Sequence, residues 1–295
     1  MRLDWLSPRT LRTLVKETYL RWSDDKVPRL GAALAYYTVF SIVPLLIIVI
    51  GIAGLVFGEE AAQTYIMAQI QSLIGPQSAE ALEEMLKTAN KPSYGFTATG
   101  LALVTLLVGA SGVFAQLQDA LNSIWKVEPK SGRGIVGLIK DRFLSFLAVL
   151  GTGFLLLVSL VVSAVLSAAG KFFSGWLPAP EAVLHAVNLV VSFAVITVLF
   201  AMIFKFLPDA RIDWNDVWIG AALTSLLFTI GKFLISLYLG KADIGSAFGA
   251  AGSFVIVLVW VYYSSQLLLF GAEFTAVYAD RFGSRILPST NQEAA

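Results

Sequence analysis

The sequence predicts an all-α, polytopic membrane protein with six transmembrane helices. Six stretches of at least 23 residues contain no Asp, Glu, Arg or Lys, or only one, and roughly 20 apolar residues allow a helix to cross the hydrocarbon core. Only 14% of the residues are charged, whereas a soluble domain carries about 25%. Because the strands of a membrane β-barrel would be about half as long and alternate in polarity, we expect these stretches to be helices.

The apolar stretches leave no loop long enough for a separate globular domain. We expect spans over residues 30–58, 94–118, 143–169, 182–204, 217–240 and 248–275. A membrane domain of residues 30–278 then lies between an N-terminal segment, 1–29, and a C-terminal tail, 279–295.

The lysines and arginines predict the orientation of the spans. Sixteen fall in the N-terminal segment, the second and fourth loops and the C-terminal tail, and four fall in the loops on the opposite side. Since positively charged loops remain in the cytoplasm, both termini are expected to be cytoplasmic.

The segment 1–29 contains the pattern of an amphipathic helix. Ser7 and Pro8 can begin it, and Leu14 and Trp22 belong to an apolar stripe beside a basic face. Such a helix is expected to lie on the cytoplasmic leaflet; a solvated helix packed on the cytoplasmic loops is the alternative. Residues 23–28 are expected to break the chain before the first span.

The first span carries Tyr37, Ser41 and Pro44 on one face. Proline removes a backbone hydrogen bond, so we expect a kink with a carbonyl that needs a partner. This face suits a substrate path or a hinge, although helix packing alone would also account for it.

The loop that follows, 59–91, shows two helical patterns separated by Gly75 and Pro76. We expect an acidic helical hairpin that caps the outer side of the membrane domain, as a lid or as a gate.

Polar residues share one face of the fifth span. They are Ser225, Thr229, Lys232 and Ser236. Ionisable residues within spans are expensive and usually face a cavity or the bundle interior, so this face is a candidate substrate path. The alternative is that the lysine reaches towards the membrane surface.

Tyr262, Gln266 and Glu273 share a face of the sixth span, with Glu273 near its cytoplasmic end. We do not expect Glu273 to pair with Lys232, because the two lie at different depths. Glu273 either belongs to a substrate path or pairs with a basic residue of the cytoplasmic loops, such as Arg142.

The composition excludes several kinds of chemistry. The chain has no cysteine and one histidine, His185, so we expect no metal site, and no phosphate-binding loop indicates a cofactor. Asp213 and Asp216 are placed to cap the fifth helix. The basic residues are explained by topology, so no nucleic acid partner is expected.

Four motifs resemble the YihY/BrkB family over about residues 27–278. The first span contains Gly31-Ala-Ala-Leu-Ala-Tyr-Tyr-Thr-Val-Phe-Ser-Ile-Val-Pro44; Gln118-Asp-Ala-Leu-Asn122 follows the second; the sixth contains Trp260-Val-Tyr-Tyr-Ser-Ser-Gln266 and Gly271-Ala-Glu-Phe274. The resemblance implies a six-helix protein of the bacterial inner membrane, and lipid or envelope-component transport has been suggested for members. The motif positions, to which no catalytic role is attached, are Tyr37, Ser41, Pro44, Asp119, Asn122, Trp260, Gln266, Gly271 and Glu273.

These observations favour a non-enzymatic transporter or flippase of a lipid or another envelope amphiphile. It would hydrolyse no ATP, and its partners would be membrane lipids and the transported amphiphile. The alternative is a structural or assembly protein that binds a second copy or an envelope protein. Ribonuclease activity is not expected, because no set of residues could activate water on a phosphodiester.

Overall fold

The computed structural model describes residues 7–89, 112–127, 181–241, 248, 251–283 and 287–288, and most of them are helical. The helices are α1 (Pro8–Asp24), α2 (Val27–Phe57), α3 (Glu59–Ile74), α4 (Pro76–Ala89), α7 (Glu181–Phe206), α8 (Trp214–Lys241) and α10 (Gly252–Phe282). A further helical segment covers residues 112–124.

Among the described residues, four helices are long and apolar enough to cross a membrane, namely α2, α7, α8 and α10. They correspond to the predicted spans 30–58, 182–204, 217–240 and 248–275. The predicted span 143–169 lies outside the described residues, and so does the span 94–118 except for residues 112–118, which are helical.

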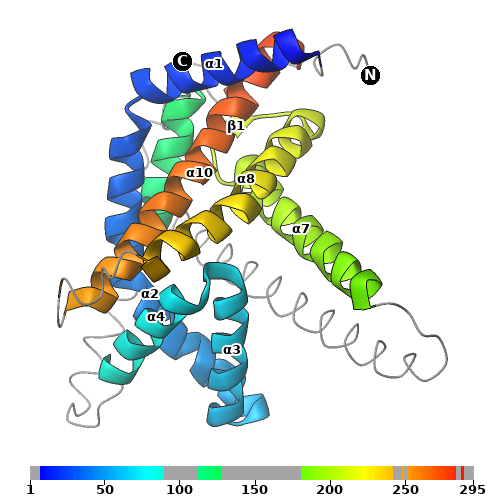
Figure 1. Cartoon of the computed structure of the whole chain (residues 1–295). Helices are drawn as coiled ribbons and strands as arrows, with labels where there is room; N and C mark the ends of the chain where they lie inside the picture. Colours follow the sequence, from blue (N-terminus) through cyan, green and yellow to red (C-terminus); the bar gives the residue numbers. More distant parts are fainter. Residues whose placement is uncertain are drawn as a thin grey trace.

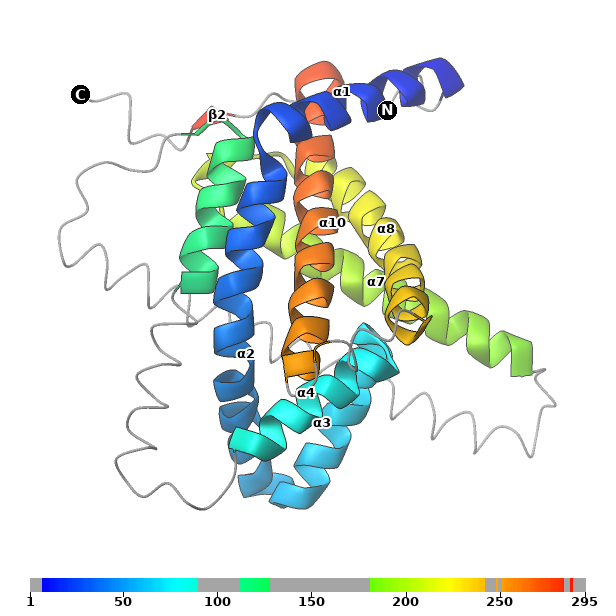
Figure 2. The same ribbon diagram turned by 60° about the vertical axis from the view of Figure 1, so that its left-hand side comes forward.

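The other helices pack around α10. It contacts α2 and α8, and it also meets α4 and α1, whereas α7 packs on α8 (Figures 1 and 2). One apolar cluster joins α2, α7, α8, α10 and the 112–124 helix around Phe204, Leu121 and Leu269. A second joins α2, α3, α4 and α10 around Val43 and Leu86. Both clusters include residues of α2 and α10, so these two helices link the two halves of the core.

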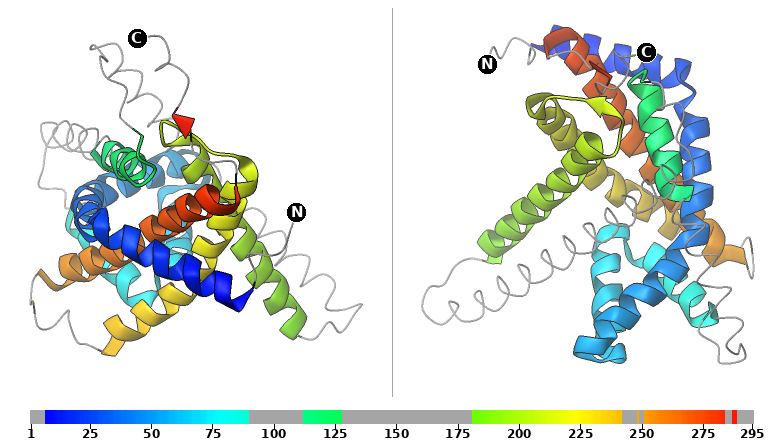
Figure 3. Two further views of the ribbon diagram at one scale, coloured as in Figure 1. Left: turned by 90° about the horizontal axis from the view of Figure 1, so that it is seen from above. Right: turned by 180° about the vertical axis from the view of Figure 1, so that it is seen from behind.

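The predicted N-terminal helix is present as α1, which crosses the ends of α2 and α10 (Figures 1 and 3). Ser7 caps it as expected, because its hydroxyl accepts a hydrogen bond from the backbone N–H of Thr10 at 3.2 Å. Leu14 is fully buried against α10, whereas Leu11 and Val15 remain exposed. Only some of the apolar side chains of α1 therefore pack on the bundle.

Asp25 and Lys26 join α1 to α2. Lys26 has a left-handed backbone, with φ of 54°, and Pro28 lies in the first turn of α2, where its missing N–H is not needed. The predicted chain break at 23–28 is confirmed. The following helix then continues through Pro44 without interruption.

The predicted hairpin is present as α3 and α4, at the end of the molecule opposite α1 (Figure 1). Gly75 separates the two helices with φ of +85°, a conformation that glycine adopts without the usual penalty. Leu82 and Leu86 of α4 are buried and Glu84 is exposed, so the apolar face of this amphipathic helix packs on the bundle.

A pair of two-residue strands departs from the all-α prediction. Strand β1 (Ala210–Arg211) pairs antiparallel with β2 (Leu287–Pro288). The pairing brings part of the predicted tail to the loop between α7 and α8. It could not be inferred from a two-residue pattern, because strands are recognised by alternation over four or more residues.

The last helix is longer than the predicted span. α10 runs to Phe282, past the end of its apolar stretch. Its charged final turns pair with α1, since Arg21 meets Asp280 at 2.8 Å and Arg281 meets Glu17 at 2.6 Å. These ion pairs stabilise the last turns of α10, which lie beyond residue 275, the predicted end of the span.

Candidate functional site

The predicted residues of α2 have different surroundings. The ring of Tyr37 lies against Gly112 of the neighbouring 112–124 helix, and Tyr37 is 39% exposed. Ser41 is buried and donates a hydrogen bond to the Thr38 carbonyl at 3.1 Å. Pro44 is half-buried. The Ser41 hydroxyl is thus satisfied within its own helix.

The polar face of α8 is also largely satisfied within the helix. Ser225 is fully buried and donates to the Ala221 carbonyl, and Thr229 donates to the Ser225 carbonyl, both at 2.8 Å. Lys232 is half-buried and interacts with neighbouring groups. The hydroxyl of Ser236 faces Gly75 in the hairpin turn, so this polar face ends at the α3–α4 hairpin.

On α10, Gln266 lines a groove at the crossing with α1. The groove has a volume of about 190 Å³ and is also lined by Tyr19, Trp22, Leu267 and Phe270. The Gln266 side chain lies against Gly31 of α2. Its buried oxygen and nitrogen have no hydrogen-bond partner among the described residues. The walls of the groove are therefore apolar, and the buried Gln266 carboxamide lies behind them, against α2. Tyr262 is 37% exposed and is not part of this lining.

Glu273 lies deeper in the bundle, next to the joint between α1 and α2. Its residue exposure is 0%, and its carboxyl group is within hydrogen-bonding reach of the Asp25 carboxyl group. Lys126 pairs with Oδ1 of Asp25. Neither carboxyl oxygen of Glu273, nor Oδ2 of Asp25, is bonded to a donor within the described part of the chain.

Because neither Glu273 carboxyl oxygen is bonded to a donor among the described residues, Glu273 makes no direct hydrogen bond to Lys232 there. Arg142, the other partner considered for Glu273, lies outside the described residues.

Asn122, one of the family-motif positions, fixes the 112–124 helix to the α7–α8 loop. Its Nδ2 donates to Oδ2 of Asp209 at 3.2 Å, and its Oδ1 accepts the backbone N–H of Asp209 at 2.9 Å. Gln118 donates to the same carboxylate at 3.3 Å. Asp119, by contrast, is exposed.

The remaining motif positions, Trp260 and Gly271, contact α8. Trp260 packs edge-on against Phe228, with ring centroids 6.4 Å apart, and Gly271 lies against Thr224. Both positions therefore have a packing role at the interface between α8 and α10.

Sequence patterns do not single out Asp25 or Lys126 as site residues. Asp25 resembles an ordinary polar residue after a helix, and Lys126 resembles a topology-setting loop lysine. The sequence signal that pointed to this place was Glu273 itself, because a carboxyl group in a predicted span requires a partner.

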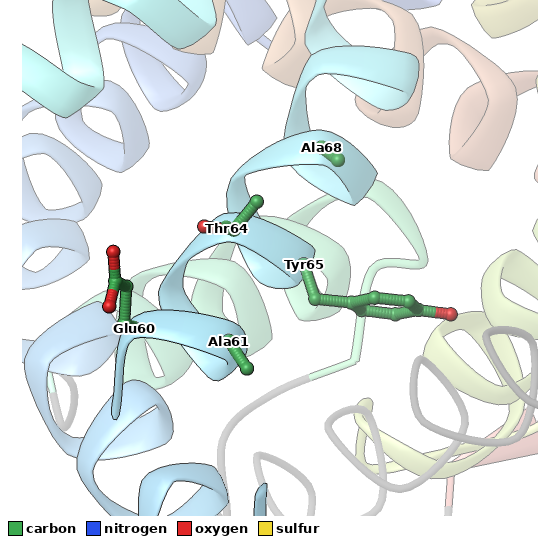
Figure 4. Close-up of a pocket in the computed structure, with 5 residues that line it drawn as sticks. All are labelled: Glu60, Ala61, Thr64, Tyr65 and Ala68. Atoms are coloured by element: carbon green, nitrogen blue, oxygen red, sulfur yellow. The ribbon is translucent and has the colours of Figure 1, made fainter. Parts of the chain in front are cut away.

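A second hollow lies along α3 (Figure 4). It has a volume of about 510 Å³ and is lined by Glu60, Ala61, Thr64, Tyr65 and Ala68. All of these residues belong to one helix, and the lining is mainly apolar. The hollow therefore brings together no set of polar groups from different elements. Within the described ranges, no group of three His, Cys, Asp or Glu residues could hold a metal ion.

Comparison with known proteins decides the family. The model of the family described as Virulence factor BrkB matches residues 18–295. The chain belongs to the BrkB family. That match includes the Gly271-Ala-Glu-Phe274 motif and both residues of the Asp25–Glu273 contact.

Curated relatives of this BrkB-family chain are named UPF0761 membrane proteins. One from Pseudomonas aeruginosa strain LESB58 is 30% identical over 260 residues, which are 85% of this chain and 59% of the relative. One from Chromohalobacter salexigens is 28% identical over 92% of this chain and 64% of the relative. The chain thus spans about three fifths of the length of these relatives. No solved structure matches it.

Proposed function

We propose that the chain is a transporter or flippase of a lipid or another envelope amphiphile and that it does not hydrolyse ATP. The observation that carries the proposal is the apolar groove between α1 and α10, with the unbonded Gln266 carboxamide buried directly behind it. The apolar lining suits the hydrocarbon chain of an amphiphile.

The energetics of the buried Gln266 carboxamide indicate a functional role for this position. Leaving a buried polar group unbonded costs about 1–3 kcal/mol, and such groups within membranes usually serve a function. Tyr19 and Trp22, whose rings stack with centroids 5.8 Å apart, form the α1 wall. Aromatic residues of this kind favour the membrane–water interface, so a lipid could enter the groove from the leaflet.

We further infer that the protein lies in the bacterial inner membrane, with both termini in the cytoplasm, and has no enzymatic role. The cytoplasmic orientation follows from the excess of Lys and Arg in the loops at the α1 end. It would place the groove at the cytoplasmic leaflet.

Reconstituted liposomes with fluorescent phospholipids test the transport proposal. We expect the wild-type protein to exchange lipids between leaflets faster than empty liposomes do. Gln266→Leu, which keeps the size but removes the polar group, should reduce the rate at least threefold, whereas exposed Gln71→Leu on α3 should leave it unchanged. A wild-type rate equal to that of empty liposomes would contradict transport of those lipids.

A structural or assembly role is the second candidate. It is favoured by the hydroxyl groups of Ser41, Ser225 and Thr229, because each donates its proton to a carbonyl of its own helix and has none left to donate to a substrate. Under this alternative, the lipid exchange rates of wild-type and Gln266→Leu liposomes would both equal the rate of protein-free liposomes.

A further inference from the structure

The buried contact between Asp25 and Glu273 would be unfavourable if both carboxyl groups were ionised. Glu273 is completely inaccessible, and an isolated buried carboxylate is destabilised by several kcal/mol unless donors or a positive charge compensate it. Three oxygens of the pair, both of Glu273 and Oδ2 of Asp25, have no donor among the described residues.

The charges around the pair compensate one carboxylate. Lys126 bonds to Oδ1 of Asp25, and Oδ2 of Asp25 has no donor among the described residues. Arg21, the other positive group that acts on Glu273, is bonded to Asp280 at 2.8 Å and to Glu17 at 3.8 Å. α8 presents Thr224 and Gly220 to this part of α10, and neither residue titrates. Two ionised carboxylates beside Lys126 would therefore leave an excess negative charge in a buried place.

From this geometry we propose that Asp25 and Glu273 form a proton-binding site that holds one shared proton at neutral pH. The proton lies between a Glu273 oxygen and Oδ2 of Asp25, so that one carboxyl group donates and the other accepts. Like-charged carboxyl groups that share a site commonly bind a single proton in this way. Asp25, Glu273 and Lys126 together then carry no net charge.

The proposed proton joins elements that are far apart in the sequence. Asp25 follows α1, Glu273 is in α10, and Lys126 follows the 112–124 helix. Loss of the proton would place two negative charges in contact and force these elements apart. The proposal is independent of the proposed lipid transport, because the site binds a proton whether or not a lipid moves.

Infrared spectroscopy of the purified full chain in detergent tests the site directly. We expect the wild type at neutral pH to show the carbonyl stretch of a protonated carboxylic acid in a water-excluded place. Glu273→Gln and Asp25→Asn should each abolish that band, and the exposed control Glu84→Gln should retain it. If the wild type lacks the band, or if Asp25→Asn retains it, the shared proton is refuted.

The pH dependence of unfolding is the second measurement. The native pair binds one proton that the unfolded, ionised carboxyl groups do not, so stability falls as the pH rises past the point at which the native site loses its proton. Between the ordinary range of free carboxyl groups and that point, the unfolding constant of the wild type should rise about tenfold more per pH unit than that of Glu273→Gln. Equal slopes would overturn the proposal. If Glu273→Gln does not fold, Asp25→Asn serves the same comparison.

Discussion

Two glycines allow α8 and α10 to approach closely. Gly220 of α8 lies against Thr275 of α10, and Gly271 of α10 lies against Thr224 of α8. The two threonine hydroxyl groups each bond to a carbonyl of their own helix at 2.7 Å. Small residues facing β-branched ones in this way are typical of tightly packed membrane helices.

We expect Gly271→Ala to destabilise the protein by about 1–3 kcal/mol, the usual range for overpacking. The added Cβ would meet the Cβ of Thr224 at 2.8 Å and its Cγ2 at 2.9 Å, so α8 must shift. Unfolding of the purified protein in mixed micelles, followed by circular dichroism, measures the change.

Gly51→Ala is the matched control, because a Cβ at that position of α2 has nothing within 4 Å. Thr224→Ala should restore part of the stability lost in Gly271→Ala, since it removes the Cγ2 and Oγ1 atoms that crowd the new side chain but keeps the Cβ. If the double variant is no more stable than Gly271→Ala, Thr224 is not the cause of the loss.

At the scale of elements, α1 is held to α10 by one buried leucine and several ion pairs. Leu14 is fully buried among Phe274, Val277 and Tyr278. The ion pairs of Arg21 and Arg281 are partly exposed, and such pairs contribute about 0–1 kcal/mol each. Hydrophobic burial should therefore dominate the docking of α1.

We expect Leu14→Ala to weaken the docking of α1 by about 2–5 kcal/mol. Amide hydrogen exchange measures the effect, since the amides of α1 should exchange faster while those of α8 change little. Leu20→Ala on the same helix is the control, because Leu20 is 50% exposed. Equal effects of the two substitutions would show that α1 does not depend on the Leu14 contact.

Local signals in the sequence predicted the elements better than their contacts. Ser7 and the Gly75–Pro76 pair mark boundaries through capping and backbone preference, which depend only on near neighbours, and the structure has both. The meeting of Asp25 with Glu273 joins residues 248 positions apart, and no periodicity encodes it. Likewise, the motif position Asn122 could be chosen from the sequence, but its bonds to Asp209 could not.

At the scale of the whole molecule, the two ends have different chemistry. α1, the charged end of α10 and the α7–α8 loop lie at one end, and the α3–α4 hairpin lies at the other (Figure 2). The chain contains no cysteine, so a single introduced cysteine reports the side on which each end lies.

We expect Ser7→Cys to react with a membrane-impermeant maleimide only in inside-out vesicles, and Glu84→Cys only in spheroplasts, because the basic end should be cytoplasmic. Both positions are exposed in the fold. The cysteine-free wild type gives the background, and solubilised samples show that each cysteine can react. The reverse labelling pattern would invert the proposed orientation.

The two-residue joint between α1 and α2 gives this arrangement a mechanical property. Asp25 and Lys26 leave no slack between the helices, so α1 acts as a lever arm whose inner end carries the Asp25 carboxyl group. Because only two residues connect α1 to α2, any tilt of α1 relative to the bundle would change the distance between this carboxyl group and Glu273.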